Sequence, residues 1–207
     1  MKIAEPFVFS DLLTKASQEP DPAKRMANIV SFISATQWVL NNRVSKPFIS
    51  MLGETYELVT PKFKFVAECV KSLPCMVAYH VSGDGFESYK TCQSKMSFTG
   101  TQVAVSDPNK TVINLFLKDG TSETYTFEHP RMVVGNMMMG TRYIEACGKV
   151  LISAPLAEAD LEFHGRAWTS NYYTNRIDAE VRMNGEAVIL VDGFYTASIM
   201  ANDKRTG

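Results

Sequence analysis

Hydrophobic residues in the first forty positions recur every three or four residues, a spacing that places them on one face of a helix. The stripe consists of Met26, Ile29, Val30, Ile33 and Leu40, with Gln37 as a polar member. Asp21-Pro22 predicts the start of this helix, because aspartate caps a first turn and proline suits the first helical position. Ser10 predicts the cap of a shorter helix over SDLLTKA.

From Lys46 onward the period of the pattern changes to two, as it does in β-strands. Asp119-Gly120 and Asn184-Gly185 each separate two such runs and predict hairpins, with Asn184-Gly185 as the stronger signal. Strands recur roughly every ten residues without a helical stretch between them. The fold is therefore predicted to be mainly β, with N-terminal helices (1–45) and a large antiparallel sandwich or barrel (46–207).

A cavity follows from the number of strands. A barrel of more than about eight strands is too wide for side chains alone to fill. An apolar cavity in an all-β protein favours a hydrophobic ligand. A chain of 207 residues suits one domain, so the pattern predicts a carrier of a small apolar molecule.

Composition excludes several other functions. The net charge of -1 and the pI of about 6.3 lack the basic footprint of a nucleic-acid-binding protein. Three scattered histidines and four cysteines without a CxxC pair predict no metal site and no cofactor. Glu54 and Glu57 have no nucleophile or histidine partner nearby, so we expect no catalytic residues and no enzyme activity.

The same features predict where the protein works. The N-terminal MKIAEPFVFSDLL lacks the sustained apolar core of a signal peptide. The cysteines are expected to be reduced, packed thiols, as in cytoplasmic proteins. We therefore expect a cytoplasmic protein that contacts membranes peripherally.

Several longer stretches are more specific than these patterns, and they keep one order along the chain. They are DPAKRMANIVSFISATQW (21–38), KPFISMLGETYEL (46–58), NMMMGTRYIEACGKVLI (136–152), EFHGRAWTSNYY (162–173) and VDGFYTASI (191–199). Together they resemble the ligand-binding domain of the oxysterol-binding protein family. The resemblance implies a wide, nearly complete antiparallel β-barrel whose apolar tunnel holds one sterol or phospholipid. Many members exchange that lipid for phosphatidylinositol 4-phosphate between membranes.

The family's EQVSHHPP signature is degenerate in this chain, where it corresponds to ECVKSLPC (68–75). Two histidines that bind the inositol 4-phosphate fall on Ser72 and Leu73, and an asparagine of the preceding motif falls on Ile49. Lys46 is retained; it either faces a headgroup or is an ordinary solvated lysine. Lys71 either replaces one of these histidines as a hydrogen-bond donor to the phosphate or has no such role. The resemblance thus predicts impaired binding of phosphatidylinositol 4-phosphate.

For the tunnel, the resemblance singles out Gln37, which matches a glutamine near the sterol hydroxyl. We expect Gln37, Trp38 and Ile33 to line the tunnel. The alternative for Gln37 is a side-chain amide satisfied by neighbouring backbone. The run Met137-Met138-Met139 either adapts to a lipid chain or, as we favour, packs within a strand.

Two parts of the family domain are expected to be missing, the apolar lid and the C-terminal helical subdomain. An open rim would then favour a homodimer or another partner. The leading hypothesis is a protein that binds a sterol or other single apolar lipid and contacts membranes transiently. The alternative is a non-transferring member that acts through protein contacts.

Overall fold

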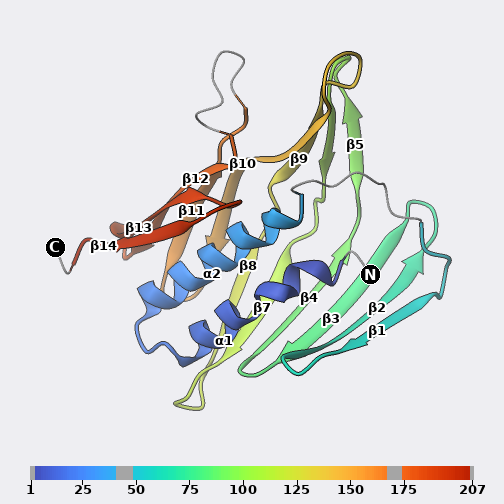
Figure 1. Cartoon of the computed structure of the whole chain (residues 1–207). Helices are drawn as coiled ribbons and strands as arrows, with labels where there is room; N and C mark the ends of the chain where they lie inside the picture. The colour runs from blue at the N-terminus through green and yellow to red at the C-terminus, as the bar shows by residue number, and fades with distance from the viewer. Residues whose placement is uncertain (1–2, 41–48, 167–173, 206–207) are drawn as a thin grey trace.

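In the computed structural model, described here for residues 3–40, 49–166 and 174–205, two α-helices pack on one face of a large antiparallel sheet (Figure 1). The helical segments are η1 (Glu5–Phe9), α1 (Asp11–Gln18), α2 (Pro22–Thr36) and η2 (Gln37–Leu40), where η denotes a 3-10 helix. The strands are β1 (Thr55–Val59), β2 (Phe63–Lys71), β3 (Met76–Gly83), β4 (Phe86–Cys92), β5 (Lys95–Phe98), β6 (Val103–Ser106), β7 (Thr111–Phe116), β8 (Ser122–Phe127), β9 (Arg131–Gly135), β10 (Tyr143–Ser153), β11 (Glu158–Phe163), β12 (Arg176–Met183), β13 (Glu186–Phe194) and β14 (Ile199–Asp203).

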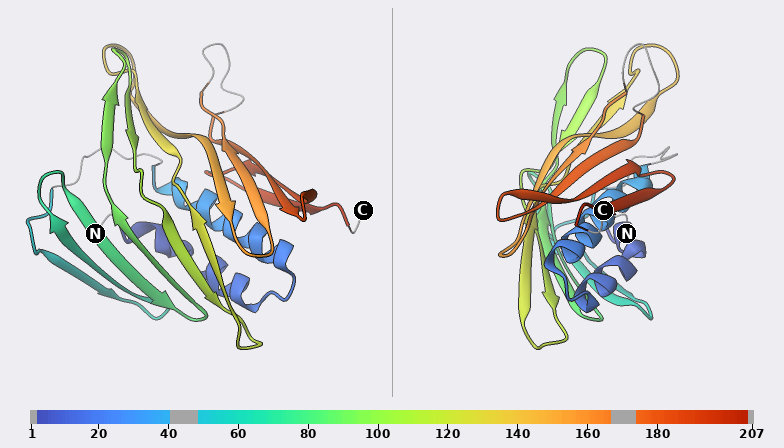
Figure 2. Two further views of the ribbon diagram at one scale, coloured as in Figure 1. Left: turned by 180° about the vertical axis from the view of Figure 1, so that it is seen from behind. Right: turned by 90° about the vertical axis from the view of Figure 1, so that its left-hand side faces the viewer.

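The strands follow the order β1-β2-β3-β4-β7-β8-β10-β11-β12-β13-β14. β5, β6 and β9 form an extension in which β5 pairs with β6, β6 with β9, and β9 with β10. β1 and β14 end the main path without pairing with each other, and β5 is the free edge of the extension, so the sheet is not closed. Seen from behind, the sheet lies in front of both helices, so α1 and α2 cover a single face, called here the inner face (Figure 2). This architecture confirms the prediction of a mainly β, nearly complete barrel with N-terminal helices.

The start of α2 is as predicted, but the start of α1 is not. Asp21 Oδ1 accepts a hydrogen bond from the backbone N–H of Ala23 (2.9 Å), and Pro22 is the first helical residue. Ser10 has helical dihedral angles, because η1 runs directly into α1, and its side chain makes no capping hydrogen bond. The prediction that Ser10 caps α1 is therefore wrong.

Both predicted hairpins are confirmed. Asn184 (φ 52°) and Gly185 (φ 85°) join β12 to β13 with two consecutive left-handed residues. Such a pair matches the twist of the flanking strands, and asparagine followed by glycine adopts it readily. Asp119-Gly120 lies in a longer loop between β7 and β8, in which Gly120 (φ 83°) is left-handed and Asp119 is not.

The core lies between the helices and the inner face of the sheet. The predicted stripe of α2 is buried, and it packs in one cluster with alternate residues of β2, β3, β4, β7, β8 and β10 to β13. Phe7 of η1 adds a ring to this core, with centroid distances of 5.7 Å to Tyr79 and 6.0 Å to Phe65. The helices therefore fill the part of the inner face that they cover.

A buried ion pair attaches the start of α2 to β8. Arg25 donates to Glu123 Oε2 through Nε (3.0 Å) and to Oε1 through Nη2 (2.6 Å). Its Nη1 donates to the carbonyls of Glu19 (2.9 Å) and Pro20 (2.8 Å). The hydroxyl of Tyr125 donates to Glu123 Oε2 (2.6 Å). The arginine of the DPAKRM stretch therefore positions the loop before α2 as well as the helix.

Candidate functional site

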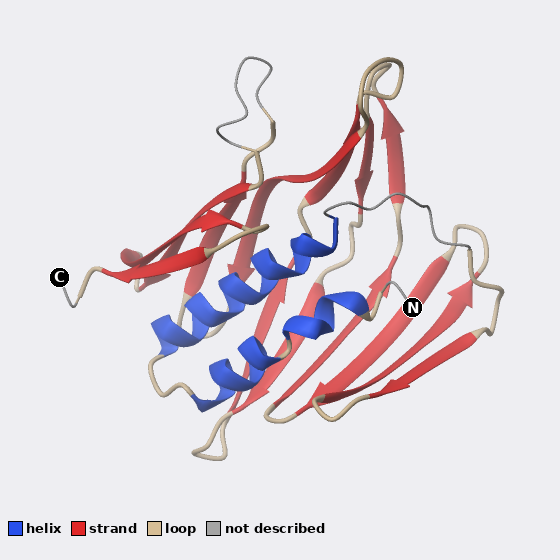
Figure 3. Ribbon diagram, in the orientation of Figure 1, coloured by secondary structure: helices blue, strands red, loops and turns tan. Residues whose placement is uncertain are grey.

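Above the helices, the inner face of the sheet continues as an apolar surface. β5, β6, β9 and the first half of β10 rise past the end of α2 (Figure 3). Their register places apolar side chains in two cross-strand rows on the inner face. We call the following seven residues the upper apolar face: Met96, Phe98, Val103, Val105, Met132, Val134 and Ile144.

The alternation of side chains along β10 identifies this surface as inner. Val150 and Ile152 face the helices, and Ala146 of the same parity is fully buried in the core. Ala146 pairs with Met132, and Ile144 pairs with Val134. The two rows are therefore a direct continuation of the core, without helices above them.

Exposure increases along the upper apolar face toward its free end. Met132, Val134 and Ile144 are half-buried, whereas Met96 and Phe98 are 68% and 62% exposed. Large contiguous apolar surfaces on soluble domains usually mark binding sites. This face is thus the strongest candidate for an apolar ligand in the part of the chain that the structure describes.

A belt of polar side chains lies below this face, next to the helix-covered core. It consists of Ser88, Lys90, Asp107, Thr111 and His129. Lys90 Nζ lies 3.1 Å from Asp107 Oδ2, and Thr111 Oγ1 lies 2.8 Å from His129 Nε2. The Ser88 hydroxyl is buried beside the Tyr79 side chain and makes no hydrogen bond of good geometry.

The order of residues along the strands sets the position of the belt. On β4 and β5, buried Phe86 is followed by Ser88 and Lys90, and then by Met96. On β8 and β9, buried Phe127 is followed by His129 and then by Met132. The inner face therefore changes from packed core to polar belt to open apolar surface.

The belt makes the stability of the protein depend on pH. The pKa of His129 is lowered to about 3, first because the protein shields the ring from water and second because the Lys90 ammonium lies nearby. The unfolded chain, with a histidine pKa of about 6.5, then binds the additional proton below that pH. Stability is complete above about pH 6.5 and falls by at most about 1.4 kcal/mol per pH unit as the pH drops toward 3.

Urea denaturation between pH 7.5 and 5 measures this slope. A His129→Gln variant is expected to show a shallower loss of stability over this range, because glutamine does not titrate. His80→Gln is the matched control, since the His80 side chain is 47% exposed and lies outside the belt. Equal slopes for His129→Gln and the wild type would contradict the assignment.

The structure places the three predicted tunnel residues differently. Ile33 is buried in the core between α2 and the sheet. Gln37 is buried at the end of α2, where Nε2 donates to Thr36 Oγ1 (3.0 Å) and to the Ile33 carbonyl (3.4 Å). Trp38 is 52% exposed and meets Phe9 edge-on. The Gln37 amide thus finds hydrogen-bond acceptors in the neighbouring turn of its own helix. The role of Ile33, Gln37 and Trp38 in lining a tunnel stays a prediction.

The two stretches predicted to form a degenerate headgroup site lie side by side near the C-terminal end of β2. The N–H of Gly53 donates to the Cys69 carbonyl (2.8 Å), and the N–H of Cys69 donates to the Glu54 carbonyl (3.0 Å). The segment that begins at Ile49 therefore lies beside the end of β2, where Lys71 is the last strand residue and Ser72 and Leu73 begin the β2–β3 turn.

The side chains in this region are exposed. Ile49 and Leu73 are 70% and 86% exposed, and Lys71 and Ser72 are exposed as well. Lys46 lies outside the described residues. The described part of this site therefore presents one ammonium group, one hydroxyl and two large apolar side chains.

The structure also bears on the methionine run, the cysteines and the search for metal sites and membrane spans. Met137-Met138-Met139 lies in the turn between β9 and β10, where Met138 and Met139 are 74% and 85% exposed, so packing within a strand is wrong. All four cysteines are unpaired. Among the described residues, no His, Cys, Asp and Glu side chains gather as a metal site, and no helix is long and apolar enough to cross a membrane.

The sequence also contained a signal for the upper apolar face that our reading missed. Apolar and small or polar residues alternate in KMSF (95–98) and in VAVS (103–106). Each run has only four residues, so the alternation alone does not distinguish the inner face from the outer one. The sheet register was needed to align them with β9 and β10.

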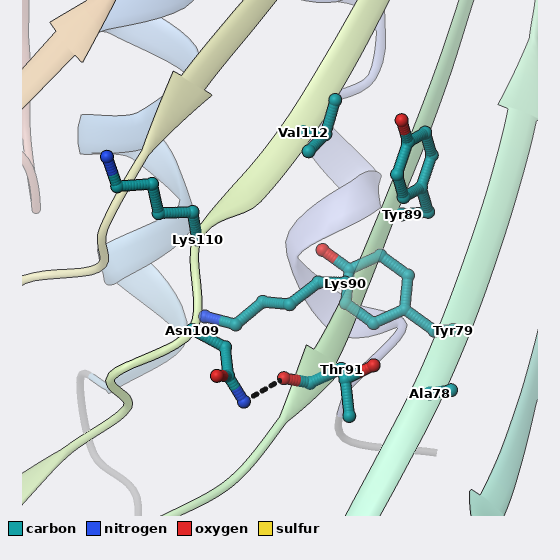
Figure 4. Close-up of a pocket in the computed structure, with 8 residues that line it drawn as sticks. All are labelled: Ala78, Tyr79, Tyr89, Lys90, Thr91, Asn109, Lys110 and Val112. Carbon is teal, nitrogen blue, oxygen red and sulfur yellow. Dashed lines mark hydrogen bonds between the residues drawn. The ribbon is translucent and has the colours of Figure 1, made fainter.

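A hollow that shares Lys90 with the belt lies where β4 and β7 diverge (Figure 4). Their ladder ends at the pair Tyr89 and Val112, and beyond it Asn109 Nδ2 donates to the Thr91 carbonyl (2.8 Å). The hollow has a volume of about 460 Å³ and is lined by Ala78, Tyr79, Tyr89, Lys90, Thr91, Asn109, Lys110 and Val112. Most of these side chains are polar, so the hollow suits a sterol less well than the upper apolar face does.

Comparison with known proteins agrees with this architecture. The family model for oxysterol-binding protein matches residues 1–207. Human oxysterol-binding protein-related protein 2 is 34% identical over 148 residues, which are 68% of this chain and 30% of that protein. Mouse oxysterol-binding protein-related protein 8 is 25% identical over 216 residues, covering 99% of this chain and 24% of the relative. The chain thus spans less than a third of the length of these curated relatives.

Solved structures share the fold. The Osh1 ORD domain in complex with cholesterol has a TM-score of 0.91 and 21% identity, and the match covers 98% of this chain and 48% of that one. The Osh3 ORD in complex with PI(4)P from Saccharomyces cerevisiae has a TM-score of 0.86 and 20% identity, covering 99% and 55%. The family match over all 207 residues and the shared fold show that the chain belongs to the oxysterol-binding protein family.

Proposed function

We propose that this protein binds a sterol or other single apolar lipid against the upper apolar face, without a catalytic step. The observation that carries the proposal is the sequence of surfaces on the inner face, a polar belt followed by an open apolar wall. A sterol has the same division, with one hydroxyl at the end of an apolar body. The cholesterol and ergosterol complexes of the Osh1 ORD domain, which has the same fold, support this ligand class.

The physical argument has two parts. Removing apolar surface from water contributes roughly 25 cal/mol per Å², so the ring system of a sterol gains most from the apolar wall. A buried hydroxyl whose hydrogen bonding is incomplete is costly, and the Ser88 hydroxyl is such a group. A ligand hydroxyl near the belt, directly or through a water molecule, would satisfy it.

Fluorescence of the sterol analogue dehydroergosterol tests this proposal. We expect saturable binding by the wild type and at least about tenfold weaker binding by Met96→Glu, because a carboxylate on the apolar wall must lose its water when the ligand binds. Ser97→Glu is the matched control, since Ser97 is exposed on the opposite face of the same strand. Circular dichroism verifies that both variants fold.

Two results would overturn this assignment. Unchanged binding by Met96→Glu would place the lipid elsewhere. No binding by the wild type, together with no co-purified lipid in native mass spectrometry, would favour a family member that acts through protein contacts.

We propose a cytoplasmic protein in transient contact with membranes, in which Gln37 adds to the polar end of the site.

We also propose that recognition of phosphatidylinositol 4-phosphate is impaired. The proposal is supported by the apolar and neutral side chains of Ile49, Ser72 and Leu73 at positions where the family signature has an asparagine and two histidines. A leucine side chain donates no hydrogen bond, and serine offers one neutral hydroxyl. Contacts to a charged group contribute about 1.5–3 kcal/mol each, so losing several weakens headgroup binding strongly.

A further inference from the structure

Two of the four free cysteines lie on either side of the β2–β3 turn. Cys69 is in β2, and Cys75 directly precedes Met76, the first residue of β3. The register of the two strands shifts between Cys69 and Lys71, so that Cys69 pairs with Val77 and Lys71 pairs with Met76. A single cross-strand pair therefore separates the two cysteines along the ladder.

The side chains of these two cysteines meet at the turn. Cys69 leans toward the turn, with its Sγ 3.4 Å from the Lys71 carbonyl oxygen and 3.6 Å from that of Ser50. The Cys69 and Cys75 thiols lie close enough to share a hydrogen bond. Thiols that are already in contact need little movement to form an S–S bond, whereas cysteines on separated strands need a shift of the backbone.

The other two cysteines are not arranged in this way. Val77 pairs with Cys69 on one side and with Cys92 on the other, so β3 lies between these two cysteines. Neighbouring strands are about 4.7–4.9 Å apart, which separates the backbones of Cys69 and Cys92 by roughly 10 Å, too far for a disulfide. Cys147 lies in β10, where its Sγ is 3.6 Å from Nη2 of Arg131.

The two thiols at the turn differ in their access to solvent. Cys69 is 1% exposed, whereas Cys75 is partly exposed. A small oxidant in solution therefore reaches Cys75 first, and Cys69 is placed to react with the oxidised sulfur. Burial and the neighbouring Cys69 thiol raise the pKa of Cys75. Little of the reactive thiolate is then present at neutral pH, so the first step is slow and responds to sustained exposure.

We propose that Cys69 and Cys75 form a site of reversible oxidation, at which hydrogen peroxide converts the two thiols into a disulfide that closes the β2–β3 turn. The Cys75 thiolate attacks one peroxide oxygen, the O–O bond breaks, and the departing hydroxide takes up the proton of the Cys75 thiol. The Cys69 sulfur then attacks the sulfenic acid at Cys75, the S–S bond forms, and the S–O bond breaks. The second hydroxide leaves as water with the proton of the Cys69 thiol. The two thiols lose two electrons, which reduce one hydrogen peroxide to two water molecules.

The ring closed by this bond contains Lys71, Ser72 and Leu73, which are exposed in the stretch predicted to be a degenerate headgroup site. A disulfide restricts the conformations that such a ring can adopt. Oxidation therefore changes the freedom of this turn without changing its side chains. In a reducing compartment the bond is transient, because cellular thiols reverse it. The proposal holds whether or not a lipid occupies the upper apolar face.

Tryptic peptide mapping without reductant tests the proposal, because trypsin places each cysteine on a separate peptide. These peptides are 65–71 with Cys69, 72–90 with Cys75, 91–95 with Cys92 and 143–149 with Cys147. The folded protein is treated with hydrogen peroxide at about pH 8, where more thiolate is present, and the remaining thiols are alkylated before digestion. We expect peptides 65–71 and 72–90 to be joined, with the loss of two hydrogens, and dithiothreitol to separate them. This product is expected to exceed any other cysteine cross-link at least about tenfold, because the two thiols are held in contact.

Two alanine variants identify the partners of the bond. Cys75→Ala is expected to abolish the cross-link, whereas the matched control Cys92→Ala retains it, since Cys92 is also partly exposed but lies on the far side of β3. Circular dichroism verifies that both variants fold. Cross-links of Cys92 or Cys147 at a similar yield would overturn the proposal, as would a link between two chains on a non-reducing gel. Wild-type protein in which Cys69 and Cys75 stay reduced, or in which Cys75 becomes mainly a sulfinic acid without a cross-link, would overturn it as well.

Discussion

Replacing Arg25 by methionine is expected to lower the free energy of unfolding by about 3–5 kcal/mol, the cost of removing one partner from a buried ion pair. Arg25 is 4% exposed and Glu123 is 7% exposed. Methionine fills most of the volume, but it leaves the Glu123 carboxylate with Tyr125 as its remaining side-chain donor and removes the donor to the Glu19 and Pro20 carbonyls. Urea denaturation at pH 7 measures the change.

A double variant separates the charge effect from the packing effect. Arg25→Met/Glu123→Leu removes both charges and is expected to be more stable than Arg25→Met, because no unpaired carboxylate stays buried. Arg182→Met is the matched control, since Arg182 forms its ion pairs at the surface and exposed pairs contribute about 0–1 kcal/mol. Similar losses in Arg25→Met and Arg182→Met would show that burial of the pair has little effect.

The helices and hairpins were predictable because their signals are local. Asp21-Pro22 and Asn184-Gly185 each specify backbone dihedral angles within a few residues, and both predictions are confirmed. Ser10 has the same kind of signal and failed. The preceding residues already form a 3-10 helix, so the N–H groups of the first α-helical turn donate to backbone carbonyls, as in the bond from Leu13 to Ser10 (2.9 Å). A cap signal thus depends on what precedes it.

The surfaces of the sheet were less predictable, because period-two alternation defines two faces without saying which one is inner. Met96 and Phe98 read as one face of a four-residue strand, and only pairing through β6 and β9 to β10 connects them to the core. The methionine run failed for a related reason. Apolar residues were read as buried, whereas Met138 and Met139 project from a turn.

The predicted headgroup site depends on local motifs and also on the pairing of segments that are distant in the sequence. Ile49 and Leu73 are more than twenty residues apart, and no local pattern predicts that the stretches around them lie side by side. The backbone hydrogen bonds that join Gly53 and Glu54 to Cys69 bring the two stretches together, and their role as a headgroup site stays a prediction. Which lipid headgroups this pair of stretches accepts depends on side chains, and these are the residues at which the resemblance predicts a departure from the family pattern.

Selective binding of phosphatidylinositol 4-phosphate is expected to be absent. In the described part of the site, Lys71 is the cation next to Ser72 and Leu73, and it is exposed to water. Exposed ion pairs contribute at most about 1 kcal/mol and are screened by salt, which is too little to distinguish one anionic headgroup from another. Vesicles with this phosphoinositide and vesicles with phosphatidylserine at equal total charge should therefore sediment the protein equally at about 0.15 M salt.

The total charge of the two vesicle preparations is matched because an exposed lysine is attracted to any anionic vesicle, whichever headgroup it carries. Selective sedimentation with the phosphoinositide, abolished by Lys71→Ala or Lys46→Ala, would show that the site has been rebuilt around lysines. Lys95→Ala is the control, since it removes one exposed charge outside the β2–β3 turn. Ser72→His/Leu73→His restores the two histidines of the family signature. A gain of selectivity in that variant would identify these two side chains as the cause of the impairment.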